Sequence, residues 1–270
     1  MATEHSGTYL APADDLPTLG APGLDDEGMK ELAGALDDPE RAPKLLTKAE
    51  ELLTGLKARV ANIEAAASEA AERFEAEAKS FFPGENVRLS ARGEMAGALR
   101  RKVAEKIRAF RGELEKNSDG DRTEVLRQLH ALDRTAAALL PLYDSPSIVL
   151  SRAGLDSVAR ERYRAQLASA GPAELQAFAR LAIAKKDRIL GAAVAARVGE
   201  LRKEQRPFAA PDLAERLVGD EQKRVVRALS AIRHRFQDAL IANRAFVKGN
   251  SRPMDKINQG LRARRAEESK

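Results

Sequence analysis

The chain has 270 residues, no cysteine and no tryptophan, and aromatic residues make up only 4% of it. The lack of cysteine excludes disulfides, zinc fingers, iron–sulfur clusters and thiol catalysis, and an apolar content dominated by Ala and Leu favours closely packed helices over strands. The net charge of +5 combines an acidic part, residues 1–149 with 20 basic and 27 acidic side chains, and a basic part, residues 150–270 with 26 and 14.

Residues 1–23 are rich in Pro, Gly and Asp and show no helical period, so we expect an acidic segment that is extended or disordered. It contains four spaced apolar side chains that a groove on a partner protein would hold: Tyr9, Leu10, Leu16 and Leu19. The pattern is equally typical of a docking segment and of a solvated tail.

Residues 24–143 predict an acidic bundle of long helices. A short helix from Asp25 to about Leu36 precedes a long one from Pro43 to about Phe82. Apolar residues recur along the long helix at alternating intervals of three and four, as in the seam of a coiled coil. This helix seam includes Leu46, Leu53, Leu56, Val60, Ile63 and Phe74.

Two further periodic segments follow in the same part of the chain. A helix over about 91–117, with Ser90 as its cap, leads to a tight loop at residues 117–120 (Asn-Ser-Asp-Gly), and another helix runs from there to about Leu140. Periodic segments joined by short loops form antiparallel bundles. The predicted fold is therefore all-α and begins with a coiled-coil-like antiparallel bundle of long helices.

Residues 144–249 predict a second, more globular and basic helical bundle. After a helix over about 156–169, a helix from Pro172 to about residue 205 is apolar on several sides and should be the buried one. Gly191 on this helix would let a neighbour approach closely.

The last predicted helices follow Pro211. A short helix ends at Val218, and a long one runs over about 221–247. The seam of the long one is Leu229, Ile232, Phe236, Ala239 and Phe246. Residues 250–270 form a basic tail.

Basic side chains gather on this last long helix and on the tail. They are Lys223, Arg224, Arg227, Arg233, Arg235, Arg252, Lys256, Arg262, Arg264 and Arg265. A nucleic acid bound here would be held by its phosphates without sequence readout, because no aromatic side chains interleave the charges to stack on bases. The alternatives are an acidic protein surface, the acidic N-terminal segment of the same chain, and a plain solvated face.

No motif for chemistry is present. The three histidines, His5, His130 and His234, lack a glutamate three residues before them, and the phosphate-loop, dinucleotide and nucleophile-elbow patterns are missing. Residues 117–121 resemble the start of a calcium loop, but its sixth position is Arg122 and not glycine. We expect no catalytic residue, no cofactor and no metal site.

The chain has no recognisable signal for export or membrane insertion. The first 23 residues lack the basic start and apolar stretch of a secretory signal. The longest uncharged run has nine residues, against the roughly 20 that a membrane-spanning helix needs. We expect no membrane span, and a location in the cytoplasm or inside a particle assembled there.

The resulting hypothesis is a non-enzymatic structural, scaffolding or adaptor protein. Its long amphipathic helices would bind other protein subunits, including further copies of itself, within a larger complex. A virion or a secretion-type machine is an analogy from architecture alone. The alternative is a sequence-nonspecific nucleic-acid-binding protein that uses the basic C-terminal half.

Overall fold

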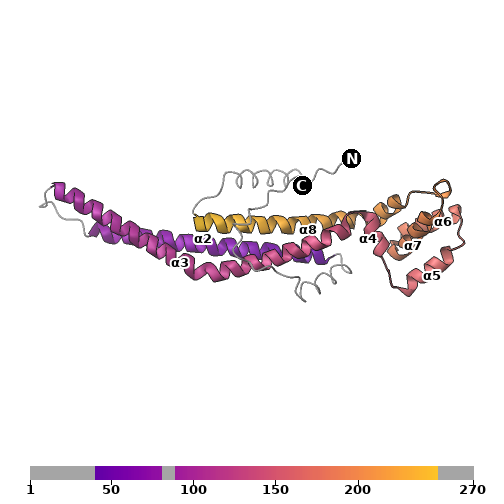
Figure 1. The fold of residues 1–270 in the computed structure, drawn as a ribbon, viewed down its shortest axis with the longest axis horizontal. Coiled ribbons are helices and arrows are strands. Elements are labelled where there is room, and N and C mark those ends of the chain that lie inside the picture. The colour runs from indigo at the N-terminus through magenta and orange to yellow at the C-terminus, as the bar shows by residue number, and fades with distance from the viewer. Residues whose placement is uncertain (1–39, 81–88, 249–270) are drawn as a thin grey trace. The chain divides into compact units, whose positions relative to one another are not determined.

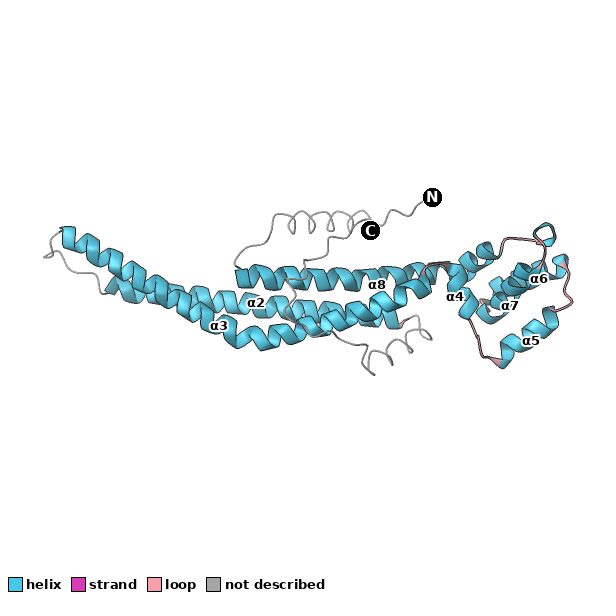
Figure 2. Ribbon diagram, viewed as in Figure 1, coloured by secondary structure: helices cyan, strands magenta, loops and turns pink. Residues whose placement is uncertain are grey.

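A computed structural model describes residues 40–80 and 89–248. Within these residues the chain forms seven α-helices and two short 3₁₀ helices, without a strand (Figures 1 and 2). The predicted all-α class is confirmed. The predicted docking residues Tyr9, Leu10, Leu16 and Leu19, the predicted short helix at Asp25 and the predicted basic tail all lie outside the described residues.

Three long helices supply most of the described chain. They are α2 (Arg41–Ser80), α3 (Leu89–Leu139) and α8 (Ala210–Lys248). The long helix predicted from Pro43 to Phe82 is confirmed as α2. Two predicted interruptions are wrong, because residues 117–120 lie inside α3 and residues 219–220 lie inside α8. The start of α3 is also earlier than predicted, so that Ser90 is a helical residue and not a cap.

The predicted loop at residues 117–120 is helical because polar residues continue the apolar seam there. Steps of four lead from Leu114 through Ser118 and Arg122 to Leu126. Leu126 is fully buried, and Arg122 is 1% exposed. The Nε of Arg122 donates to Ser118 Oγ at 3.1 Å, so the two polar seam residues partly satisfy each other. Turn chemistry is a local preference, and packing along the whole helix overrides it here.

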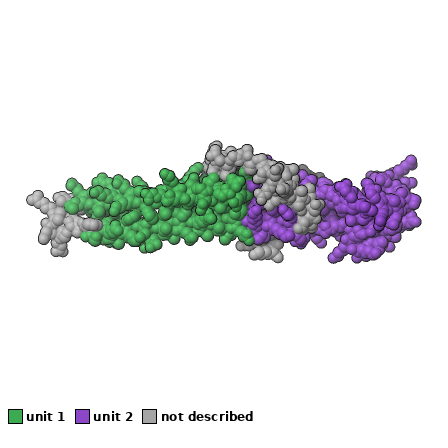
Figure 3. Space-filling model, turned by 90° about the horizontal axis from the view of Figure 1, so that it is seen from below, with its two compact units in different colours: residues 1–22, 49–130, 234–270 green, residues 23–48, 131–233 purple. Residues whose placement is uncertain are grey.

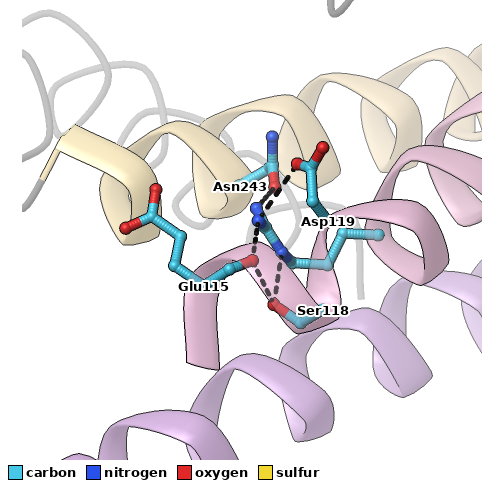
Figure 4. A network of polar contacts seen from close by, with 5 residues as sticks. Glu115, Ser118, Asp119 and Asn243 are labelled. Atoms are coloured by element: carbon cyan, nitrogen blue, oxygen red, sulfur yellow. Dashed lines mark hydrogen bonds and ion pairs between the residues drawn. The ribbon is translucent and has the colours of Figure 1, made fainter. Parts of the chain in front are cut away.

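Arg122 also binds α3 to α8 (Figure 4). One terminal nitrogen donates to Asn243 Oδ1 of α8 at 2.6 Å, and the other donates to the Glu115 carbonyl oxygen at 3.1 Å and to Asp119 at 3.2 Å. The guanidinium lies 4.8 Å from the centre of the Phe246 ring, within the range of a cation–π contact. A buried charge is tolerated because its donors are met from both helices.

Gly219 does not end a helix, contrary to the predicted break after Val218. A Cβ on Gly219 would come within 2.7 Å of Cδ of Glu215, one turn earlier in α8. Glu215 in turn accepts a hydrogen bond from Lys223 at 2.6 Å. The glycine therefore leaves room for a side chain of its own helix, and α8 continues.

Four shorter helices lie between α3 and α8. They are α4 (Pro146–Arg152), α5 (Val158–Leu167), α6 (Pro172–Lys185) and α7 (Arg188–Glu200). The helix start at Pro172 is confirmed, but the single helix predicted from there to about residue 205 is wrong. Lys186 adopts the left-handed conformation, with φ of 51°, and ends α6.

Asp187 begins α7 with two hydrogen bonds. One of its carboxylate oxygens accepts from the backbone N–H of Leu190 at 2.9 Å, which is an N-cap interaction. The other accepts from the hydroxyl of Tyr163 on α5 at 2.8 Å. Asp187 therefore both starts a helix and ties it to a neighbouring one.

The contacts divide the chain into two compact units (Figure 3). The described residues of unit 1 are 49–80, 89–130 and 234–248, and those of unit 2 are 40–48 and 131–233. The last part of α8 packs with α2 and α3 in unit 1. The domain limits at residues 143 and 249 stay predictions.

The core of unit 2 is built around α7. Its buried residues are Leu190, Gly191, Ala192, Ala193, Val194 and Val198. A Cβ on Gly191 would stand only 2.3 Å from Cδ1 of Leu217 on α8. The predicted close approach at Gly191 is therefore confirmed, and so is the burial of this helix.

Arg160 on α5 stabilises the end of α4. It is 5% exposed, and one terminal nitrogen donates to the carbonyl oxygens of Ser151 at 2.7 Å and Ala153 at 3.0 Å. A cation at a helix C-terminus interacts favourably with the last carbonyl groups. Burial lowers the pKa of Arg160.

Candidate protein-binding groove

Contacts within unit 1 show where α8 ends beside α3. The rings of His130 and Phe236 stack with centroids 5.3 Å apart, and Arg122 bonds to Asn243. The two helices are therefore antiparallel. Lys248, at the end of α8, lies five positions after Asn243, and the position five before Arg122 is residue 117 of α3. The end of α8 therefore lies level with residue 117.

A second set of contacts shows which residue of α2 lies beside the end of α8. Arg59 bonds to Asp121 at 2.9 Å, and further along α2 Phe74 packs on Phe110. The helices α2 and α3 are therefore antiparallel, and residue 63 lies level with residue 117. Because α2 and α8 are both antiparallel to α3, they are parallel to each other. Arg235 of α8 bonds to Glu50 of α2 at 2.7 Å. Thirteen positions further along each helix, residue 248 lies beside residue 63. Beyond this level α2 and α3 continue as a pair in the described part of unit 1 (Figure 1).

We call residues 64–80 of α2 and 93–117 of α3 the two-helix segment. Its only buried residue is Ala70, at 2% exposure. The rings of Phe74 and Phe110 pack edge to face with centroids 6.2 Å apart, yet both are only partly buried. The other half-buried seam residues of α3 here are Ala96, Leu99, Val103, Ile107 and Leu114.

The predicted helix seam on α2 therefore has two parts. Leu53 and Leu56, at the level of α8, are buried at 5% and 0% exposure, whereas Val60 and Ile63 are partly buried, as Phe74 is further along. Leu46, which belongs to unit 2, is also partly buried. The seam of α8 is buried throughout: Leu229, Ile232, Phe236, Ala239 and Phe246. Apolar periodicity predicted where helices meet, but not how many helices meet there.

A groove of about 520 Å³ lies between the two helices of the segment. It is lined by half-buried apolar residues, Ala78, Leu99, Val103, Ala104 and Ile107, and by exposed charged ones, Glu75, Lys79 and Arg100. An apolar groove bordered by charges is typical of a surface that receives an amphipathic helix.

The two helices of the segment carry opposite charge. Residues 64–80 hold five acidic and two basic side chains, a balance of −3, and residues 93–117 hold seven basic and four acidic ones, a balance of +3. Among the described residues, no ion pair joins these two stretches. Lys106 of α3 lies 5.6 Å from the centre of the Phe74 ring of α2. The other charges of the two stretches are available to a partner.

The basic cluster on α3 was not recognised from the sequence. Its members are all exposed: Arg100, Arg101, Lys102, Lys106, Arg108 and Arg111. A charge sum over residues 1–149 conceals it, because the acidic first 40 residues dominate that sum. A count over residues 100–111, with six basic side chains and one acidic, would have found it.

The predicted basic surface on α8 is partly neutralised by the chain itself. Lys223 pairs with Glu215 at 2.6 Å, Arg224 with Glu40 at 2.5 Å and Arg235 with Glu50 at 2.7 Å. The pairing with Glu215 raises the pKa of Lys223. Arg227 is exposed and Arg233 is half-buried. Arg252, Lys256, Arg262, Arg264 and Arg265 lie outside the described residues.

Other kinds of site find little support in the described ranges. No cluster of three His, Asp or Glu side chains there is arranged to hold a metal ion, and no helix there combines the length and apolar character needed to cross a bilayer. A second cavity, of about 220 Å³, lies beside Arg160 and is lined mainly by alanines. The groove is the feature that best fits a binding function.

Comparisons with protein-family models, with curated proteins and with solved structures find no match for this chain. The groove and the charges around it are therefore the features from which a function can be inferred.

Proposed function

We propose that the protein is a non-enzymatic scaffolding or adaptor protein that joins other protein subunits through its long helices. The two-helix segment supports this proposal, because its apolar seam is only half-covered in the described chain. In a helical bundle each apolar stripe is buried against neighbouring helices. A further helix, or pair of helices, laid into the groove would complete that burial.

Burial of the apolar side chains of the groove would favour the binding of a partner. Apolar surface removed from water contributes about 25 cal/mol per Å². A specific protein–protein interface removes roughly 1,200–2,000 Å² in total. Side chains such as Leu99, Val103 and Ile107 would lose their remaining exposure to water when the groove is filled.

The alternative function, nonspecific nucleic-acid binding, has one observation in its favour and one against it. The exposed basic cluster on α3 offers phosphate contacts. On α8, however, Lys223, Arg224 and Arg235 already face carboxylates of the same chain. A nucleic acid would have to displace those carboxylates, so the basic surface predicted on α8 would bind it less tightly than the formal charges suggest.

A site-specific photocrosslinking experiment in the native cells tests the proposed function. A photoreactive amino acid replaces Ala104, which lines the groove, or Ala109, an exposed residue on the same helix that does not line it. We expect protein adducts from position 104, identified by mass spectrometry, and few from position 109. Equal yields at the two positions, or adducts to nucleic acid alone, would contradict the proposal.

A further inference from the structure

We infer that the groove is filled by the same segment of a second copy of this chain. The inference rests on the proposed function, since it names the partner of that surface. Each copy would contribute α2 and α3 of its two-helix segment, and the pair would form an antiparallel four-helix bundle. The two-fold axis would run along the helices, so that α2 of each copy lies against α3 of the other. Beyond the level of Lys248 the two copies would diverge, because α8 lies on that face of α2 and α3.

Symmetry makes this arrangement self-consistent. In a two-fold interface, any contact from α2 to the α3 of the other copy is repeated in reverse. Because α2 and α3 are antiparallel within one chain, each helix would also be antiparallel to its neighbour from the second copy. Short antiparallel bundles of this kind are built from helix pairs with half-covered apolar seams.

Charge selects this pairing over the others. With α2 against α3, a stretch of balance −3 faces one of balance +3, twice per dimer. With α2 against α2, two stretches of −3 would face each other, and like charges at an interface are unfavourable. Since no ion pair between the two stretches uses these charges within the described chain, they remain available to the second copy.

The groove residues suit a helix pair as the occupant. Ala78 and Ala104 are small and allow helix axes to approach closely, while Leu99, Val103 and Ile107 supply larger side chains between them. The 17 residues of α2 in the segment extend for about 25 Å at 1.5 Å per residue. This length gives between four and five helical turns of contact on each side.

Sedimentation equilibrium of the purified full-length chain tests the inference. Across about 1–100 µM protein we expect the mass of a dimer. Ala104→Glu places a larger, charged side chain in the groove and should weaken dimerisation by at least about tenfold, because the side chain would overlap the second copy and its charge would lose contact with water. Ala109→Glu, the same change on the exposed face of α3, should leave the dimer unchanged. Circular dichroism of both variants checks that the helices are intact.

A charge-reversal pair tests the contact between α2 and α3 directly. Arg100→Glu on α3 and Glu75→Arg on α2 each make the charges that border the groove more alike in a homodimer, so each should dimerise about threefold to tenfold more weakly. Mixed together, the two chains have opposite charges at both contacts. We expect the mixture to recover the wild-type affinity as a heterodimer, and a mixture no tighter than either variant alone would overturn the inference.

The outcomes also separate this inference from the proposed function. A chain that is monomeric at all concentrations, yet crosslinks from position 104 to a different protein in cells, would refute self-association and leave the scaffolding function standing. A dimer that dissociates on nuclease treatment would mean that nucleic acid bridges the copies, which refutes direct contact. Absence of both a dimer and a groove-specific crosslink would refute both proposals.

Discussion

Removal of the buried guanidinium of Arg122 should loosen the end of α8 from α3. Arg122→Ala leaves a cavity and loses a charged donor to Asn243, which together should cost about 3–5 kcal/mol. Arg122→Met retains much of the side-chain volume, so only the polar contribution and the contact with Phe246 are lost, about 1–2 kcal/mol. The ion pair with Asp119 contributes little to either value, because that carboxylate is 70% exposed.

Amide hydrogen exchange in residues 234–248 measures this effect where it should occur. Each 1.4 kcal/mol corresponds to a factor of ten in the opening equilibrium. We expect exchange about 5–30 times faster in Arg122→Met and more than about a hundred times faster in Arg122→Ala. The amides of α7, in unit 2, serve as the internal control and should exchange as in the wild type.

A double-mutant cycle with Asn243→Ala separates the hydrogen bond from general packing. If Arg122 binds α8 through Asn243, the double variant Arg122→Met/Asn243→Ala should lose less stability than the two single variants lose in sum. The difference should be about 1–2 kcal/mol. Strictly additive effects, or unchanged exchange in Arg122→Met, would refute the role of this bond in attaching α8.

Two further predictions concern unit 2. Gly191→Ala should destabilise it by about 1–2 kcal/mol, because the clash of the new methyl group with Leu217 outweighs the gain in helix propensity. Gly199→Ala, on the same helix with open space around it, should stabilise it by about 0.5–1 kcal/mol. Urea unfolding should therefore show a lower free energy of unfolding for the first variant and a higher one for the second. The hydrogen bond to Asp187 raises the pKa of Tyr163, so its stabilising effect is complete below the ordinary tyrosine pKa and is lost as the pH rises through the folded value. Phenolate absorbance should therefore show a late-titrating tyrosine that is absent in Tyr163→Phe and returns towards the ordinary pKa in Asp187→Asn.

The sequence predicted the fold class and the long helices because apolar periodicity is a local signal that packing preserves. It failed at residues 117–120, where Asn-Ser-Asp-Gly is also the composition of a turn. Arg122 decides between a loop and a continuous helix there, and its partner Asn243 lies 121 positions away. A polar layer within a seam cannot be told from a loop without knowledge of that partner.

The break between α6 and α7 was missed because its residues do not have the composition of a turn. Neither glycine nor proline marks Lys186, and Asp187 becomes a convincing helix start only when Tyr163 is seen beside it. The groove was likewise beyond local reasoning. It exists in the described structure because Lys248 comes level with Ile63 and Asn117, and that register follows from long-range contacts alone.

The position of Arg160 has a consequence for how order is lost in unit 2. Helix α4 has only seven residues, too few to persist alone in water, and its last carbonyl groups depend on a side chain from α5. When α5 melts, that donor leaves, and α4 keeps the packing of Leu150 against Ala192 of α7 and Ala214 and Val218 of α8. Loss of order in α5 should therefore destabilise the end of α4 without removing its support from α7 and α8.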